Sequence, residues 1–303
     1  MATFKTYDSV GAKEDVSDVI SMLNKHETPF TSSLETRTVS QKTYEWQEDE
    51  QEGGKDNAQV EGFDAVEEAL DTTEMRSNTT QIFSRTIRLS GSLQATEHYG
   101  RKNELARQLV KKGKALKLDY ERACVGVDQA SVLGSNTVAR RFASASQMID
   151  AGNKIDNTGT GAAGPLLETT LRKAIKKNYD EGGNARRFMV APYVAEQTAE
   201  FAGNASRTRE VTGKGAKEIV HVVDVYTTAL GTLTIETNRE IKADFGLLWN
   251  PENWRKVVLK GRGWFRETLA KTGDNTKIML AGEYGLQHDN YKASVLVTDI
   301  AAA

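Results

Sequence analysis

The sequence predicts an α+β protein that contains one unusually long β-hairpin. Three observations predict this class. Two extended segments enclose an acidic, glycine-containing stretch, and a long amphipathic helix follows them. Residues 165–237 then alternate between helix and strand patterns, and most of the remaining chain reads as β-strands.

Charge is segregated along the chain. Residues 45–74 contain twelve carboxylates and one cation, Lys55, whereas residues 97–122 contain eight Lys or Arg and four carboxylates. The local net charges are therefore about −11 and +4 in a chain whose total is −2. Such segregation indicates that surfaces of opposite charge contact each other or a partner.

The composition excludes several classes of protein. A chain of 303 residues can bury a sizeable core, and its single cysteine excludes an internal disulfide or a zinc site with several thiolates. The N-terminus lacks the apolar core and cleavage site of a signal peptide. No apolar run approaches the ~18 residues that cross a bilayer. We therefore expect a protein made in the cytoplasm, with no membrane partner.

The N-terminal third of the chain is expected to be extended. Residues 1–30 form an arm, and the segments 36–46 and 79–93 are predicted strands. The second strand has apolar residues at alternate positions, namely Phe83, Ile87, Leu89 and Leu93. The whole of 31–95 is then one long hairpin, or flap, with the acidic stretch inside it.

The helix expected over 97–127 has the clearest pattern. At about 100° per residue, its apolar residues lie within about 60° of one line; they are Leu105, Leu109, Leu116, Tyr120, Cys124 and Val127. The opposite line is basic and carries Arg107, Lys111, Lys114 and Arg122, with Leu118 among them. Gly113 lies on the apolar side, where glycine costs about 1 kcal/mol relative to alanine. We therefore expect another backbone to approach Gly113 closely.

The remaining predicted elements are shorter. After a loop at 150–164 we expect helices at 165–179 and 192–203 and strands at 188–191, 219–227, 232–236, 245–249, 254–260, 277–286 and 293–298.

No pattern of catalytic, cofactor-binding or metal-binding residues stands out. The glycines of 159–164 match the spacing of a dinucleotide fingerprint, but no apolar strand precedes them and no P-loop lysine follows. The four histidines are isolated in sequence. The carboxylates of 45–74 resemble a calcium loop only loosely. Cys124 lies on the apolar stripe, so we expect a buried thiol rather than a nucleophile.

These residues are also compatible with two other functions. An oligomeric enzyme could use the 159–164 loop as a phosphate site, and a nucleic-acid-binding protein could use the basic helix at 101–122. Against nucleic acid, the basic face has no interleaved aromatic residues, and the acidic stretch offers it a protein counterpart.

The predicted flap implies an assembly. A connection of about sixty residues far exceeds the roughly 2–6 usual in a compact domain. An isolated two-stranded hairpin is marginal in water, and repulsion among its carboxylates weakens this one further, so the flap needs a surface to lie on. A neighbouring copy supplies one, and contact between different patches of identical subunits propagates into rings, shells or filaments.

Short motifs accompany this order of elements. They lie at residues 3–8, 14–15, 28–30, 44–47, 100–106, 269–274 and 283–286. With the order of arm, flap, basic helix, α/β unit and β-rich end, they resemble the major capsid proteins of tailed bacteriophages. These proteins share the Hong Kong-type capsid fold, and the resemblance is greatest to the SU-ten-like major head proteins. It covers nearly the whole chain, with residues 128–165 departing most.

The resemblance implies a structural protein without an enzymatic site. It implies an N-terminal arm (1–30), an extended loop (31–95), a peripheral domain with a spine helix (96–150), an axial domain (151–240) and return strands of the peripheral domain (241–303). Subunits would form the hexamers and pentamers of a virion head around double-stranded DNA, after synthesis in the cytoplasm of the bacterial host. A portal protein would be a further partner, with cement or scaffold proteins as optional ones.

We predict that the acidic flap of one subunit lies over the basic helix of the next. The residues expected at this interface are Glu48, Asp49, Glu50, Glu67 and Glu68 on the flap and Arg107, Lys111, Lys114, Leu118 and Arg122 on the helix. No cofactor is expected.

Overall fold

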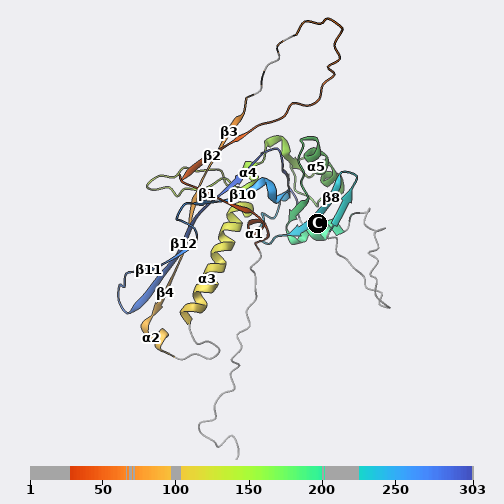
Figure 1. Ribbon diagram of the computed structural model, residues 1–303. Coiled ribbons are helices and arrows are strands. Elements are labelled where there is room, and N and C mark those ends of the chain that lie inside the picture. The colour runs from red at the N-terminus through yellow and green to blue at the C-terminus, as the bar shows by residue number, and fades with distance from the viewer. Residues whose placement is uncertain are drawn as a thin grey trace, which may run out of the picture.

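Two β-sheets form the framework of the protein, and a long loop projects from them (Figure 1). The computed structural model describes residues 28–65, 67, 70, 72–96, 104–199, 201 and 225–301. Most of the predicted arm and the first part of the strand expected at 219–227 lie outside these residues.

The first sheet gathers strands from both ends of the chain. They are β1 (Glu35–Val39), β4 (Gln81–Ser90), β10 (Trp254–Leu259), β11 (Phe265–Leu269) and β12 (Asn275–His288). The long β12 pairs antiparallel with β4 along one edge and with β10 and β11 along the other, and β1 pairs parallel with β10. Phe83, Ile87 and Leu89 of β4 are buried, as their alternation predicts, because side chains of a strand alternate between its faces.

Helix α3 (Glu104–Glu121) lies along the first sheet and ends in a π-helical turn at Arg122–Gly126. Leu116, Tyr120 and Cys124 of the predicted apolar stripe are buried. Val127 is exposed, contrary to the prediction, because the helix ends before it and the backbone becomes extended. Residues 97–103 of the predicted helix lie outside the described residues.

The second sheet has the strand order β5-β13-β9-β6-β8-β7. Its strands are β5 (Lys154–Asp156), β6 (Arg187–Val190), β7 (Val225–Thr228), β8 (Gly231–Thr237), β9 (Gly246–Trp249) and β13 (Val295–Thr298). Helices α5 (Glu168–Asp180) and α6 (Pro192–Ala199) pack against it. Phe188, Met189 and Leu248 are fully buried at its centre, so this unit has a core of its own. The described residues also form the shorter α-helices α1 (Pro29–Ser32), α2 (Gly91–Ala95) and α4 (Ala145–Met148).

An aromatic cluster joins the two sheets. Phe30 of α1 packs against Trp249 of β9 and Trp254 of β10, with ring centroids 4.7 and 5.6 Å apart. All three side chains are inaccessible to solvent. Because each residue comes from a different segment, this cluster fixes the start of the described chain against both sheets.

Glu121 is a buried carboxylate at the same junction. It accepts hydrogen bonds from the N–H groups of Phe30 and Thr31, at 2.9 and 2.8 Å, and from Asn238 Nδ2 at 2.7 Å. Burial raises the pKa of Glu121, although these hydrogen bonds oppose the rise by stabilising the charged form. Glu121 thereby holds together α1, the end of α3 and the segment after β8.

The predicted hairpin over 31–95 is wrong in its extent. Antiparallel pairing is confined to β2 (Thr43–Glu48) and β3 (Glu74–Thr79), whereas β1 and β4 join the first sheet. The physical reason is burial. In the first sheet α3 packs against β4, whose Phe83, Ile87 and Leu89 are buried, whereas a two-stranded ribbon would leave these side chains in water.

The strands of the expected return segment at 241–303 divide between the two sheets, and β9 and β13 do not join the sheet beside α3. Both pair in the second sheet. All four residues of β9 are buried, and a strand covered on both faces has no alternation to show which sheet it joins. Strand β11 is absent from the sequence prediction because its three central residues are all exposed and polar.

His288 is a buried histidine whose burial predicts how stability depends on pH. Its ring stacks on Trp254 at 3.8 Å, and its nitrogens lie 3.0 Å from Ser294 Oγ and 3.3 Å from the Met148 carbonyl. Burial lowers its pKa from 6.5 to about 3. Between these values the unfolded chain binds the proton more readily, so the free energy of unfolding falls as the pH falls.

We therefore expect His288 to remove roughly 3 kcal/mol of stability between pH 7 and pH 4, at about 1.4 kcal/mol per pKa unit. Urea denaturation across this range, on the parent and on His288→Gln, measures the effect. The difference between the two proteins should shrink as the pH falls, and a constant difference would contradict the expectation.

Candidate subunit-contact surface

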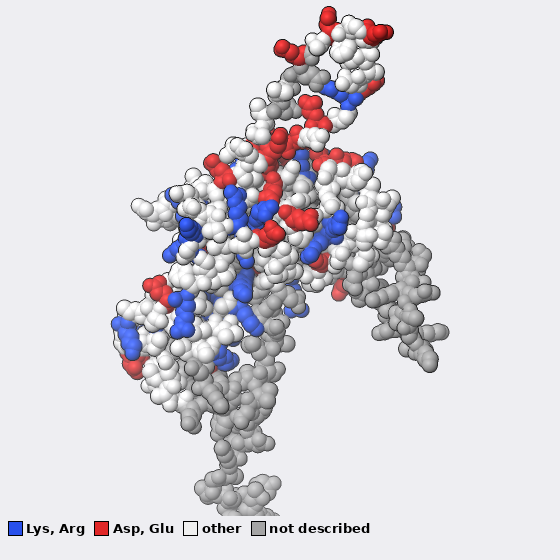
Figure 2. All heavy atoms as spheres, viewed as in Figure 1, with Lys and Arg blue, Asp and Glu red and all other residues white. Residues whose placement is uncertain are grey.

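The loop between β2 and β3 is acidic and projects away from both sheets (Figure 1). Its described residues 49–65, 67, 70 and 72–73 are all exposed. In Figure 2 carboxylates gather on this loop and around its base, and Lys and Arg are spread over the body beneath it. A chain segment with this charge and so little contact with its own body has its surface available for another molecule.

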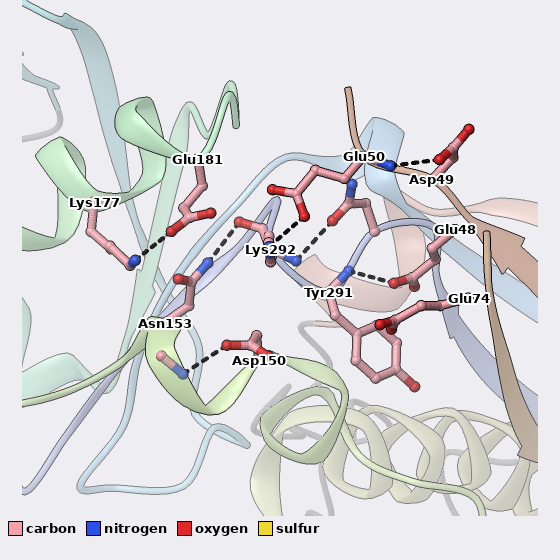
Figure 3. Close-up of polar contacts among 12 residues, drawn as sticks. Glu48, Asp49, Glu50, Glu74, Asp150, Asn153, Lys177, Glu181, Tyr291 and Lys292 are labelled. Atoms are coloured by element: carbon pink, nitrogen blue, oxygen red, sulfur yellow. Dashed lines mark hydrogen bonds and ion pairs between the residues drawn. The ribbon is translucent and has the colours of Figure 1, made fainter. Parts of the chain in front are cut away.

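The base of the loop is fixed to its own subunit by polar contacts (Figure 3). Lys292 donates a hydrogen bond to Glu50 at 2.5 Å, and the N–H group of Tyr291 donates to Glu48 at 3.5 Å. Arg76 of β3 also pairs with Glu48, at 3.2 Å, and its guanidinium lies 4.6 Å from the centre of the Tyr291 ring. Glu48 and Glu50, which were expected to face a neighbour, are thus engaged within the subunit.

These contacts line an acidic cleft of about 510 Å³. Burial raises the pKa of Glu48, and burial together with the charge of Glu48 raises the pKa of Tyr291 to about 12. The described residues include no group of three or more His, Cys, Asp or Glu that could hold a metal ion.

The basic face of α3 is only partly neutralised. Lys111 is exposed and Lys114 half-buried, and neither forms an ion pair with the described part of the chain. Two arginines pair within the subunit, Arg107 with Glu104 at 3.5 Å and Arg122 with Glu240 at 3.9 Å. The Arg122 side chain is mostly exposed, and an exposed ion pair contributes only about 0–1 kcal/mol, so Arg122 can exchange its partner readily.

The other predicted interface residues are spread over the two surfaces. Asp49 and Glu67 are exposed on the loop, and Glu68 lies outside the described residues. Leu118 is half-buried on α3. The loop and the helix are not brought together within one subunit, since the loop points away from the end of the body where α3 begins (Figure 1).

The glycine-rich loop at 159–164 does not present a phosphate site. Asp156 accepts hydrogen bonds from the N–H groups of Gly161 at 2.8 Å and Thr158 at 3.0 Å, and these contacts lower its pKa. A phosphate would need such N–H groups for itself. The carboxylate of Asp156 therefore occupies the position that the enzyme hypothesis reserves for an anion.

Cys124 is fully buried, and burial raises the pKa of its thiol, which confirms the predicted packing role. Across the described ranges, no helix combines the length and apolar character needed to cross a membrane.

Solved structures of other proteins define the fold. The capsid of Cyanophage P-SCSP1u matches with a TM-score of 0.64 at 13% identity, over 97% of this chain and 94% of that chain. The phage G structure of major capsid and decoration proteins matches with a TM-score of 0.61 at 9% identity, over 99% and 100%. The fold is the Hong Kong-type fold of phage capsid proteins, as the sequence resemblance implies.

Sequence relatives then define the family. A major capsid protein of Escherichia phage Phieco32 is 30% identical to this chain. The alignment, 341 residues long, covers 97% of this chain and 96% of the relative. The family model described as SU10 major capsid protein matches residues 2–301. The chain belongs to the SU10 major capsid protein family. It is a structural protein of the virion that assembles with copies of itself, and it is not an enzyme.

Proposed function

We propose that the subunit builds an icosahedral head through a contact in which the acidic loop at 49–73 of one subunit lies over α3 of the next. The observation that carries this proposal is the loop itself, whose described residues are all exposed and whose base is tied to its own body by the contact of Glu50 with Lys292. Lys111 and Lys114, which form no ion pair with the described part of the chain, give α3 a matching charge. Because the two patches differ, the contact is heterologous and repeats from subunit to subunit.

The two sheets take different positions in the proposed shell. The first sheet with α3, the spine helix, forms the peripheral domain, and the second sheet forms the axial domain that meets its copies at the centres of hexamers and pentamers. Because β9 and β13 pair in the second sheet, the axial domain includes these two strands as well as residues 151–240.

The proposed shell encloses double-stranded DNA and contains a portal protein. Cement or scaffold proteins are optional further partners, and the subunit is made in the cytoplasm of the bacterial host. Membership of the capsid family supports these partners.

Reversal of two charges on α3 tests the contact. We expect Lys111→Glu with Lys114→Glu to leave the subunit folded, since surface substitutions usually change stability by less than about 0.5 kcal/mol. Each exposed pair contributes about 0–1 kcal/mol, so turning two attractions into repulsions should lower the yield of closed particles by about tenfold or more. Particle yield from sedimentation and negative-stain microscopy measures this effect.

The matched control is Lys173→Glu with Lys176→Glu, which makes the same charge change at exposed positions of α5. It should assemble far better than the α3 variant. Compensation by Glu61→Lys with Glu67→Lys on the loop should restore part of the yield. Normal shells from the α3 variant, or equal defects in both helices, would count against the proposal.

A further inference from the structure

An apolar groove runs between α3 and the strands β11 and β12. It has a volume of about 360 Å³, and its apolar lining includes Val110, Gly113, Trp264 and Leu280. Val110 is 60% exposed and Trp264 36% exposed, so these side chains face solvent within the single subunit. Large apolar side chains gathered in an open groove indicate a contact that the subunit does not make by itself.

One wall of this groove is held rigidly. The Trp264 ring lies 4.2 Å from the ring of Tyr284 and packs directly over Gly282, where an added Cβ would come within 2.4 Å of the indole. The backbone N–H of Trp264 also donates to the Tyr284 hydroxyl at 2.9 Å. A tryptophan fixed in this way binds a partner with little loss of side-chain freedom, as anchor residues of protein interfaces do.

Gly113 of α3 also lines the groove. A Cβ atom there would have no atom within 4 Å, so the close backbone approach expected from the sequence is wrong within the subunit. No contact with the described part of the chain requires glycine at this position, and glycine weakens a helix. The missing side chain instead leaves space beside Val110 that an incoming group can fill.

The acidic loop carries a turn that fits this space. The N–H group of Phe63 donates to the Val60 carbonyl at 3.2 Å, and Gly62 has a φ of 82°, as the third residue of a type II turn requires. Val60 is 77% exposed and Phe63 54% exposed. The turn therefore presents two apolar side chains to solvent at a defined position.

Charge complementarity selects this occupant for the groove. Lys114, Lys117 and Arg266 are among the residues that line it. The turn contains Glu61, and Asp64 follows it directly. Insertion of the apolar side chains would place these carboxylates against the basic rim, where partial desolvation reduces screening by salt.

The loop of the same subunit does not fill the groove. Figure 1 shows the loop projecting from the end of the body opposite to β11 and the start of α3. Its base is held there by the contacts of Glu48 and Glu50. A second copy of the chain can supply the turn.

We infer that Phe63, with Val60, inserts into the groove of Val110, Gly113 and Trp264 on the neighbouring subunit. This inference rests on the proposed loop-to-helix contact and adds an apolar plug to it. The charges then guide the loop to α3, and the plug fixes its register.

A larger side chain at position 113 gives the first test. Gly113→Leu should raise the midpoint of thermal unfolding of the unassembled subunit by about 1–3 °C, because leucine favours a helix. The same variant should lower the yield of closed particles by about tenfold or more. Ala115→Leu, outside the groove on the same helix, is the control and should assemble normally. Normal assembly of Gly113→Leu would overturn the inference.

A disulfide gives the second test, which is independent of variant stability. The single native cysteine, Cys124, is buried, so any disulfide that forms involves the introduced thiols. Phe63→Cys combined with Val110→Cys should form covalent dimers and longer chains in oxidised particles, because a disulfide requires Cα atoms within about 7 Å. The control combines Phe63→Cys with Leu230→Cys, which lies at an exposed turn of the second sheet, and it should form no such cross-link.

The results separate the plug from the proposed function. Loss of assembly on charge reversal of α3, with no cross-link from the Phe63 and Val110 pair, would overturn the plug and leave the electrostatic contact in place. Cross-linking of Val16→Cys to Val110→Cys, instead of Phe63→Cys, would assign the groove to the N-terminal segment and also overturn the inference. Normal shells from the variant with reversed charges on α3 would contradict the proposed loop-to-helix contact itself.

Discussion

Replacing residues 49–73 by Asn-Gly is expected to abolish closed shells while leaving a folded, soluble subunit. The substitution closes β2 and β3 with a two-residue turn that suits their antiparallel pairing. Among the described residues that are removed, Glu50 contacts the body through Lys292. Loss of this contact should lower the free energy of unfolding by no more than about 1 kcal/mol, and the shorter connection should raise it, at about 0.6 kcal/mol for each halving of loop length. Assembly should fail because the segment proposed to reach the neighbour is gone.

Size-exclusion chromatography and negative-stain microscopy measure this result. A Gly/Ser segment of the same length at 49–73 is the matched control, and it should also fail to form shells, since the proposed contact depends on carboxylates and apolar side chains. Closed particles at parental yield from the shortened chain would show that the loop is not the assembly element.

Glu121→Ala is expected to be the most destabilising single substitution at the junction of the two sheets. It leaves two N–H groups, of Phe30 and Thr31, and the amide of Asn238 without their buried acceptor. An unsatisfied buried donor costs about 1–3 kcal/mol, and removal of the buried charge offsets part of this. We expect a net loss of about 3–5 kcal/mol in the free energy of unfolding, measured by urea denaturation of the unassembled subunit.

The pH dependence of this effect has a definite sign. Because burial raises the folded-state pKa of Glu121, the folded state binds the proton more readily than the unfolded chain does. Its contribution to the free energy of unfolding therefore decreases as the pH rises from the unfolded-state pKa through the folded-state pKa. Glu121→Ala should lack this component. Glu267→Ala, at an exposed position of β11, is the control and should change stability by less than about 0.5 kcal/mol.

Local sequence patterns predicted the helices and strands well where one face of the element is buried and the other is exposed to solvent. The alternation of Phe83, Ile87 and Leu89 identifies β4, and the stripe of Leu116, Tyr120 and Cys124 identifies α3. These patterns depend only on near neighbours in sequence. The acidic loop and the basic helix, likewise, were visible as runs of charge.

Long-range partners could not be predicted from such patterns. Phe30, Trp249 and Trp254 meet across more than two hundred residues of chain, and no local period shows that they pack together. In the sequence Glu121 is one of the four carboxylates within the basic segment 97–122, and this charge pattern does not show that it is buried. One signal pointed to its burial, which is that it lies between Tyr120 and an apolar run at 123–125.

The contacts at the loop base were missed for the same reason. Lys292 and Tyr291 follow the loop by more than two hundred residues, and nothing near them in sequence shows that they meet Glu50 and Glu48. Once these contacts are known, the charge that remains for a neighbour lies farther out on the loop, where Glu61, Asp64 and Glu67 are exposed. The structure thus moves the proposed contact toward the loop tip.

A reconstruction of assembled particles by electron cryo-microscopy, at a resolution that shows side chains, tests the loop-to-helix contact most directly. The account predicts that residues 49–65 of each subunit lie over α3 of the adjacent subunit, with loop carboxylates within about 4 Å of Lys111 or Lys114. Loops that lie on their own subunit, or that cross the second sheet of a neighbour and leave α3 uncovered, would contradict it.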